Sequence, residues 1–223
     1  MNMQKSKDRI IPTLIVSLAL SLGLAACGSG STAVAADCAW AQHPSDIANL
    51  VAVSHFAAAP PTCITRASTG TYTATFQMTK GTITVTLDQQ LAPVSVNNFV
   101  FLATHHFYDN VLFHRVVPNF IAQGGDPNSI VPGVALTSLG SGGPGYTIAN
   151  EFPKTSTVFT QGCLAMANSG PGTTGSQFFF CTADDSQKLA PYYNYFGKVT
   201  VGMDLLSQIA QGDAIQSITI SHS

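Results

Sequence analysis

The sequence predicts a mostly β fold, a closed antiparallel β-barrel capped by two α-helices. Many short apolar segments are divided by Gly- and Pro-rich connections, which is typical of a barrel or a sandwich. Only two stretches have the periodicity of a helix. The 223 residues, of which 45% are hydrophobic and 9% charged, suffice for one good-sized domain with its own core.

The first element of the barrel is a hairpin. Between Tyr72 and Thr79 apolar residues alternate with Thr and Gln, the period of a half-buried strand. Lys80-Gly81 is a turn signal, and residues 83–87 again alternate with threonines. The two runs therefore predict two strands joined by a tight turn.

Helix and strand signals then follow in order. Pro93 suits the first turn of a helix, and one apolar face follows it at helical spacing, namely Val96, Phe99, Val100 and Ala103. A second helix is predicted over Met203 to Ala210. The remaining apolar segments are expected to be strands: 112–117, 120–122, 163–167, 178–182, 195–199 and 215–220.

The N-terminus has the features of an export signal. A basic start precedes an apolar run of 17 residues, Ile10 to Ala26, which is short for a membrane span of roughly 20 residues. The run ends in Leu24-Ala25-Ala26-Cys27, which resembles the lipobox of bacterial lipoproteins. We expect residues 1–26 to be a signal peptide and Cys27 to carry a lipid anchor. A secretory signal with an incidental cysteine is the alternative.

The mature chain is then expected outside the cytoplasm, held to a membrane of the cell envelope. Residues 27–36, rich in Gly, Ser, Thr and Ala, predict a flexible tether, and residues 37–71 an extension of undefined fold. Without residues 1–26 the chain keeps six Lys and Arg against ten Asp and Glu, a net charge of −4. That balance excludes a basic surface for nucleic acid.

Export permits disulfides among the four remaining cysteines. Cys38 and Cys63 both precede the main domain, and we expect them to form a bridge that closes the extension. Cys163 and Cys181 lie in apolar runs, so each is expected to be a buried structural thiol.

The stretch Phe113 to Asp126 places Arg115 among apolar and aromatic residues in a chain poor in charge. A guanidinium carries five donors in a planar fork, so there it must face a buried carboxylate or a site where a ligand supplies the acceptor. Asp126 and Glu151 are the only acids between Asp109 and Asp184, which favours the open site.

This stretch resembles the signature of the cyclophilins, peptidyl-prolyl cis/trans isomerases with an eight-stranded barrel and two capping helices. Further blocks match in the family's order: Gly140–Tyr146 followed by Asn150–Phe152, Leu164–Pro171, Gly175–Phe179 and Phe196–Val199. The resemblance covers about Thr73 to Ile220, so we expect residues 72–223 to be a cyclophilin-like domain.

The resemblance implies a role for each matching position. Arg115 matches the catalytic arginine. The expected substrate-binding residues are Phe120, Ile121, Gln123, Met166, Ala167, Asn168, Ser169, Gln177, Phe179, Leu189 and Tyr193. The substrates implied are proline-containing polypeptides, handled by a monomer that needs no metal or other cofactor.

The chain departs from the family pattern at three places. Ile121 replaces the usual methionine, and Tyr193 stands where many members have a histidine. The loop from Asp184 to Leu189 is about one residue longer than usual, with Gln187 or Lys188 in place of a tryptophan that helps to hold cyclosporin. We therefore expect weak cyclosporin binding without loss of catalysis.

Two classes of function remain on the sequence alone. The first is an exported prolyl isomerase that assists the folding of exported or envelope proteins. The second is a holdase or scaffold that binds proline peptides with little turnover. A metal site at His105, His106 and His114 is not favoured, since only Asp109 adjoins them at ligand spacing. No serine lies in a Gly-x-Ser-x-Gly elbow of hydrolases.

Overall fold

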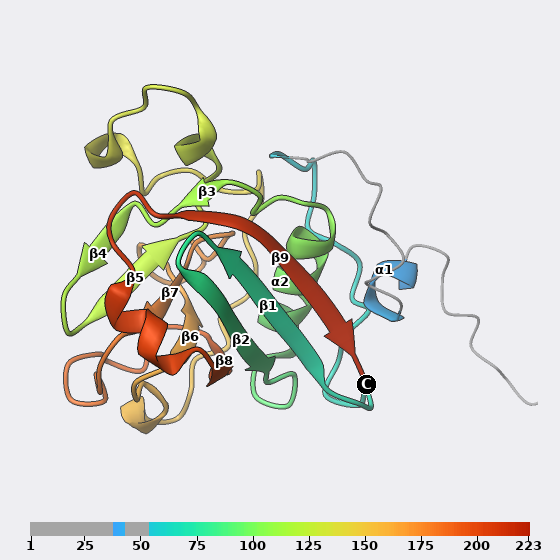
Figure 1. The fold of residues 1–223 in the computed structure, drawn as a ribbon. Helices are drawn as coiled ribbons and strands as arrows, with labels where there is room; N and C mark the ends of the chain where they lie inside the picture. The colour runs from blue at the N-terminus through green and yellow to red at the C-terminus, as the bar shows by residue number, and fades with distance from the viewer. Residues whose placement is uncertain (1–37, 43–53) are drawn as a thin grey trace, which may run out of the picture. The chain divides into compact units, whose positions relative to one another are not determined.

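The computed structural model describes residues 38–42 and 54–223. Nine strands in this part form one antiparallel sheet, ordered β3-β9-β1-β2-β8-β6-β7-β5-β4 (Figure 1). The predicted signal peptide, Cys27 and the tether lie outside the described residues.

The strands fall close to the predicted segments. Their bounds are β1 (Tyr72–Met78), β2 (Gly81–Leu87), β3 (Val111–Leu112), β4 (Arg115–Val117), β5 (Ile121–Gly124), β6 (Cys163–Met166), β7 (Phe178–Cys181), β8 (Tyr195–Val201) and β9 (Ala214–His222). The hairpin is confirmed, because Met78 pairs with Gly81 and Thr73 with Thr86. Alternate residues of β1 are buried, as the period of two predicts.

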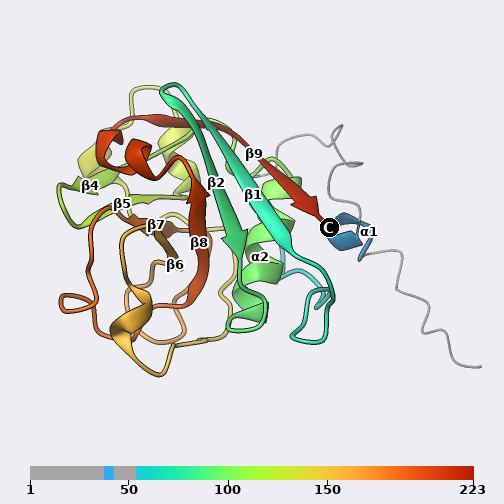
Figure 2. The same ribbon diagram turned by 60° about the horizontal axis from the view of Figure 1, so that its bottom comes forward.

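One of the two predicted helices is confirmed. The α-helix α2 (Pro93–Thr104) begins at the predicted proline and lies across one side of β1 and β2 (Figure 2). The second, expected over Met203 to Ala210, is instead a 3₁₀-helix over Met203–Gln208. Left-handed Gly202 (φ 81°) precedes it and extended Ile209 ends it, so the helical segment is limited to six residues. A short α1 (Ala39–Gln42) lies in the extension.

The sheet is curled but not closed, so the prediction of a closed eight-stranded barrel is wrong. Among the described residues β3 pairs only with β9, and β4 only with β5. Between β3 and β4 the Phe113 N–H donates to the Asp213 carbonyl, and the Gly212 N–H donates to the Phe113 carbonyl. After β3 the chain therefore stays hydrogen-bonded to the residues just before β9, and β4 does not fold back to pair with β3.

Aromatic rings fill the space between the sheet and α2. Phe76 of β1 and Phe99 of α2 are fully buried, with ring centroids 5.9 Å apart. Phe178 and Phe180 of β7 both face this main core, whereas Phe179 between them belongs to a second cluster. This alternation follows from the pleat of the strand, and it decides which residues reach the site.

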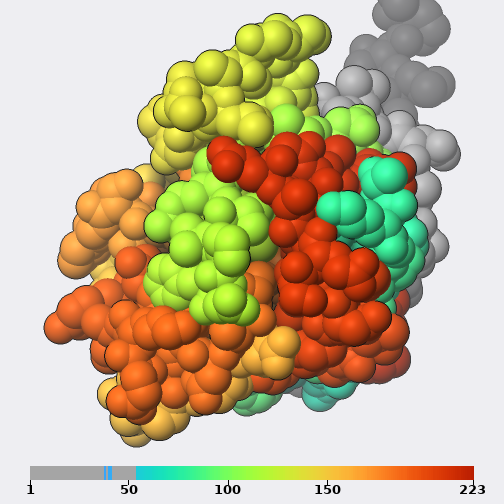
Figure 3. Space-filling view, turned by 60° about the vertical axis from the view of Figure 1, so that its left-hand side comes forward, coloured from blue at the N-terminus to red at the C-terminus, as the bar shows by residue number. Residues whose placement is uncertain are grey.

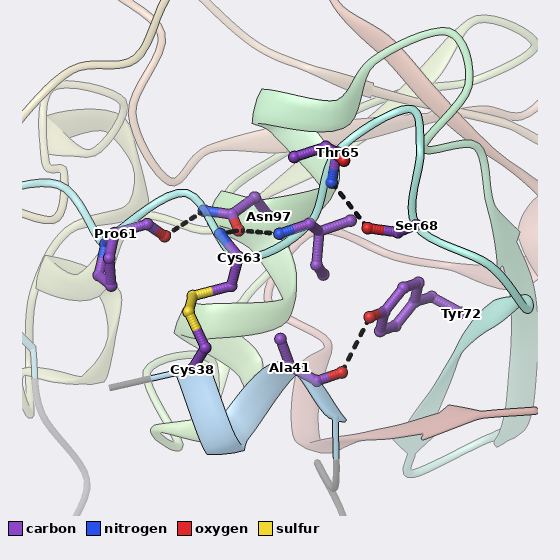
Figure 4. Close-up of a disulfide and its surroundings, with 9 residues drawn as sticks. Cys38, Ala41, Pro61, Cys63, Thr65, Ser68, Tyr72 and Asn97 are labelled. Atoms are coloured by element: carbon purple, nitrogen blue, oxygen red, sulfur yellow. Dashed lines mark hydrogen bonds between the residues drawn. A yellow bond between two sulfur atoms is a disulfide. The ribbon is translucent and has the colours of Figure 1, made fainter. Parts of the chain in front are cut away.

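The extension is fastened to α2. Asn97 of α2 accepts the backbone N–H groups of Cys63 (2.9 Å) and Ile64 (2.8 Å) and donates to the Pro61 carbonyl (Figure 4). The predicted Cys38–Cys63 disulfide is confirmed (Figure 4). Trp40 packs edge-on against Phe101 of α2. The backbone of Pro61 is therefore held at the helix.

Cys163 and Cys181 are buried as expected, but they form a disulfide and not two free thiols. β6 and β7 pair Leu164 with Phe180, so the next residues outward, Cys163 and Cys181, face each other. Their Cα atoms are 5.1 Å apart, within the range that a disulfide spans. Sequence spacing could not show this, because strand register brings the two sulfurs together.

Within residues 38–42 and 54–223, no helix combines the length and the apolar character needed to cross a bilayer.

Candidate active site

The hairpin of β4 and β5 carries the predicted signature at the edge of the sheet. Arg115 pairs with Gln123 across it, and Val117 with Ile121. The turn includes Asn119 at φ 56°, a left-handed conformation that asparagine adopts more readily than most residues. In Figure 3 this hairpin (yellow-green) is at the surface, between the segment after β5 (yellow) and the segments around β6 and β7 (orange).

Arg115 is exposed, and hydrogen bonds join it to a line of two side-chain amides, Gln123 and Gln177. Its Nη1 donates to Gln123 Oε1 at 3.4 Å, and Gln123 Nε2 donates to Gln177 Oε1 at 3.0 Å. Gln177 Nε2 in turn donates to the Gly142 carbonyl at 2.8 Å. The line orients the guanidinium without neutralising its charge.

The two acids that could have paired with Arg115 are engaged elsewhere. Asp126 accepts the backbone N–H groups of Asn128, Gly140 and Gly142, all within 3.0 Å. Glu151 accepts those of Val94 and Ser95 at the first turn of α2. In the described part of the chain Arg115 takes part in no ion pair. The donors of Arg115 that do not bind Gln123 are therefore open to a ligand.

An apolar cluster lies beside Arg115. Phe179 and Ile121 are nearly buried in it, 2% and 5% exposed, and Phe120, Ala167, Leu189 and Tyr193 pack against it. The rings of Phe179 and Tyr193 meet edge to face, with centroids 5.4 Å apart. The expected substrate-binding residues Phe120, Ile121, Phe179, Leu189 and Tyr193 thus come together as apolar walls, from β5 and the turn before it, β7 and the loop before β8.

Met166 does not join them. It is fully buried in the main core, because it alternates along β6 with Ala165, which faces the apolar cluster. The expectation that the Met166 side chain binds substrate is therefore corrected.

Lys188 connects the two loops at the rim of the apolar cluster. Its Nζ donates to the Asn119 carbonyl and to Asp185 Oδ1, both at 2.9 Å, and lies 5.7 Å from the centre of the Phe120 ring. Burial raises the pKa of Asp185, and the hydrogen bond from Lys188 opposes that rise. Lys188 therefore fixes the loop that positions Leu189.

The polar residues line a neighbouring cavity of about 750 Å³. Gln123, Ala167, Asn168, Ser169 and Gln177 form one side of it. The glycine-rich segment 140–147 forms the other side. Arg115 and the apolar cluster adjoin this cavity through Gln123 and Ala167 but lie outside it.

His114 lies beneath the site, next to Arg115 in the chain. It is 4% exposed, and neither ring nitrogen has a hydrogen-bond partner among the described residues. Burial lowers the pKa of His114, an effect that nearby Asp126 opposes. A neutral ring avoids placing a second cation beside Arg115.

The roles of three residues were missed by the sequence reasoning. Glu151 satisfies the first backbone N–H groups of α2 from a distant loop, and buried Asn194 accepts the Glu151 N–H at 2.7 Å. His55 of the extension lines the cavity. No local pattern marks these residues, since each contact joins segments far apart in the chain.

No group of three or more His, Cys, Asp or Glu side chains in the described ranges is arranged to hold a metal ion. His106 Nδ1 and Asp109 Oδ2 are 3.0 Å apart and form a local pair.

Comparison with known proteins agrees with this geometry. Residues 73–222 match the model of the cyclophilin-type peptidyl-prolyl cis-trans isomerases. The chain belongs to this family. A Helicobacter pylori peptidyl-prolyl cis-trans isomerase is 40% identical over 152 residues, which cover 67% of this chain and 87% of the relative. Isomerase B of Bacillus subtilis is 37% identical over 131 residues, covering 59% and 85% of the two chains.

Solved cyclophilins are similar in fold as well. A Cryptosporidium parvum cyclophilin-type isomerase matches with a TM-score of 0.58 and 26% identity over 69% of this chain and 99% of its own. The same parasite cyclophilin has been solved in the presence of the dipeptide Ala-Pro, and that chain matches with a TM-score of 0.54. The protein is thus a cyclophilin-type peptidyl-prolyl cis-trans isomerase.

Proposed function

We propose that this cyclophilin isomerises Xaa-Pro bonds of exported or envelope proteins, with Arg115 as its catalytic residue. The observation that carries the assignment is the exposed guanidinium of Arg115 beside the apolar cluster, while Asp126 and Glu151 are held by backbone N–H groups.

The chemistry of the reaction suits a fixed donor. Rotation about a peptide bond faces a barrier of ~18–20 kcal/mol, because the nitrogen lone pair is conjugated with the carbonyl. In the twisted transition state the prolyl nitrogen loses that conjugation and becomes a better hydrogen-bond acceptor. A donor held against it stabilises the transition state more than the planar ground state, which lowers the barrier. Arg115 is that donor in our proposal.

The apolar cluster would bind the proline ring. Phe120, Ile121, Phe179, Leu189 and Tyr193 offer it ring and aliphatic walls, while Gln123 and Asn168 hold the peptide that precedes the proline. The Ala-Pro dipeptide used with the parasite relative supports a ligand of this kind. Water excluded by the pocket strengthens the contact between Arg115 and the prolyl nitrogen.

A cis/trans assay on short Xaa-Pro peptides tests the catalytic assignment. Arg115→Ala is expected to lower kcat/KM by about 10²–10³-fold, the loss typical of one preorganised donor. Full activity in this variant would refute the role of Arg115. If the wild-type protein binds proline peptides but they isomerise only at the uncatalysed rate, the second function, a holdase or scaffold, would be favoured instead.

We further propose that the chain acts as a monomer, anchored to the cell envelope through a lipidated Cys27. The support for the anchor is the order of basic start, apolar run and Leu-Ala-Ala-Cys in the sequence. Labelling of cells with a radioactive fatty acid should mark the wild type and not Cys27→Ala. An unlabelled wild type would refute the anchor, and a dimer in sedimentation would refute the monomer.

A further inference from the structure

Residues 54–56 of the extension are attached to the glycine-rich segment beside the cavity. The Phe56 N–H donates to the Pro144 carbonyl at 2.8 Å. The Phe56 ring packs against Phe101 of α2 and against His105, which directly follows the helix, with centroids 4.9 and 5.8 Å away. Phe56 is therefore an anchor, and it fixes the place of its neighbour His55.

His55 lies directly against Gly145. A Cβ atom built on Gly145, whose φ is 97°, would come within 2.5–2.8 Å of the imidazole ring and 2.4 Å of the Phe56 carbonyl. Only a glycine there leaves room for the extension. The imidazole consequently forms part of the cavity wall.

The cavity adjoins the peptide groove. It shares Gln123 and Asn168 with the residues proposed to hold the peptide before the proline, so a side chain that enters it comes from that part of the substrate. Its volume of about 750 Å³ accommodates a long side chain.

The lining of the cavity is mostly glycine, backbone and small hydroxyls such as Ser141 and Thr147. No Asp, Glu, Lys or Arg side chain is among the described lining residues. Burial raises the pKa of Tyr146, which keeps its phenol neutral. Asp126 lies behind the wall, under Gly142, and disfavours an anion. The wall therefore suits a long uncharged side chain with hydrogen-bonding groups.

We propose that His55 is a specificity-determining residue of the isomerase, and that with this cavity it selects a glutamine-like side chain one or two positions before the proline. The proposal rests on the site assigned above. By this assignment the N-terminal extension is part of the substrate site, and not only a connection to the rest of the chain.

The test compares kcat/KM for peptides that carry Gly, Leu, Gln or Lys at each of these two positions. Wild type is expected to prefer Gln at one of them. His55→Ala should reduce the Gln-to-Gly ratio by about 3- to 10-fold, the effect of one lost hydrogen bond. Phe56→Ala, which releases the anchor, should reduce the same ratio, and circular dichroism verifies that both variants are folded.

Ser54→Ala is the matched control, since Ser54 is an exposed neighbour that does not line the cavity; its ratio should equal that of wild type. An unchanged ratio in His55→Ala, or a wild type that prefers Leu or Lys, would overturn the proposal. The His55 test measures a ratio of kcat/KM between two peptides. The Arg115 test measures a loss of kcat/KM that is shared by all peptides, so the two proposals can fail independently.

Discussion

Arg115 and Gln123 face each other across β4 and β5, and Gln123 Oε1 accepts a hydrogen bond from Arg115 Nη1 at 3.4 Å. Through Gln177 the same line of amides reaches the backbone of Gly142. The orientation of the guanidinium thus depends on three segments, of which only one contains the arginine.

Removal of the Gln123 amide should therefore loosen Arg115. Gln123→Leu is expected to reduce kcat/KM by about 5- to 10-fold, the effect of one hydrogen bond, while the fold is kept. The peptide isomerisation assay measures this. Gln77→Leu, on the exposed face of β1, is the matched control and should keep full activity. Equal activity of Gln123→Leu and wild type would show that the amide does not orient Arg115.

The Cys163–Cys181 disulfide should stabilise the domain. A bridge across a sequence separation of 18 residues is expected to contribute about 3 kcal/mol by restricting the unfolded chain. The double variant Cys163→Ala/Cys181→Ala should therefore unfold at a lower temperature than wild type. The double variant Cys38→Ala/Cys63→Ala should mainly increase proteolysis of the extension. In the Cys38→Ala/Cys63→Ala variant, unfolded without reductant, two titratable thiols besides that of Cys27 would contradict the pairing.

The contact of Lys188 with buried Asp185 predicts a stability change that depends on pH. Lys188→Met should cost about 1–2 kcal/mol near neutral pH, less than a fully buried pair because half of the lysine side chain is exposed. Burial raises the pKa of Asp185, so the folded state favours its neutral form, which needs no cation beside it. The unfolding free energy that Lys188→Met loses relative to wild type should therefore shrink as the pH falls towards about 4. Denaturant unfolding at several pH values measures this. Lys80→Met, which removes an exposed pair with Asp213, is the control; a deficit in Lys188→Met that is the same at every pH would contradict the prediction.

His114 predicts a second dependence on pH. Burial lowers its pKa below that of the unfolded chain, so the unfolded state takes up the proton first, and stability falls as the pH drops below about 6.5. His114→Phe should reduce the loss of unfolding free energy between about pH 7.5 and 5, as denaturant unfolding at these pH values measures. Parallel pH profiles for His114→Phe and wild type would refute this role.

Cyclosporin should inhibit this cyclophilin weakly. By resemblance to the family, Gln187 or Lys188 stands in place of the tryptophan that helps to hold the drug in sensitive members. Inhibition of peptide isomerisation measures the constant, and a sub-micromolar value would contradict the prediction. Gln187→Trp is expected to strengthen inhibition, with catalysis retained.

Local patterns predicted much of the fold. The hairpin of β1 and β2 follows from alternation, and α2 from Pro93 and an apolar face. The segment over Met203–Gln208 was misjudged as an α-helix, because apolar spacing over so short a stretch does not distinguish α from 3₁₀ geometry. The closed barrel was also wrong, since closure depends on how β3 and β4 pair and not on the pattern within either strand.

The sequence by itself determined the family, the apolar walls of the pocket and the shortage of acids around Arg115. Those properties depend on residue types and their order. Only the tertiary structure decided that Cys163 meets Cys181, that Met166 turns into the core and that His55 reaches the cavity. Strand register, the direction of the pleat and the docking of a distant segment fix these contacts, and none of them leaves a local trace in the chain.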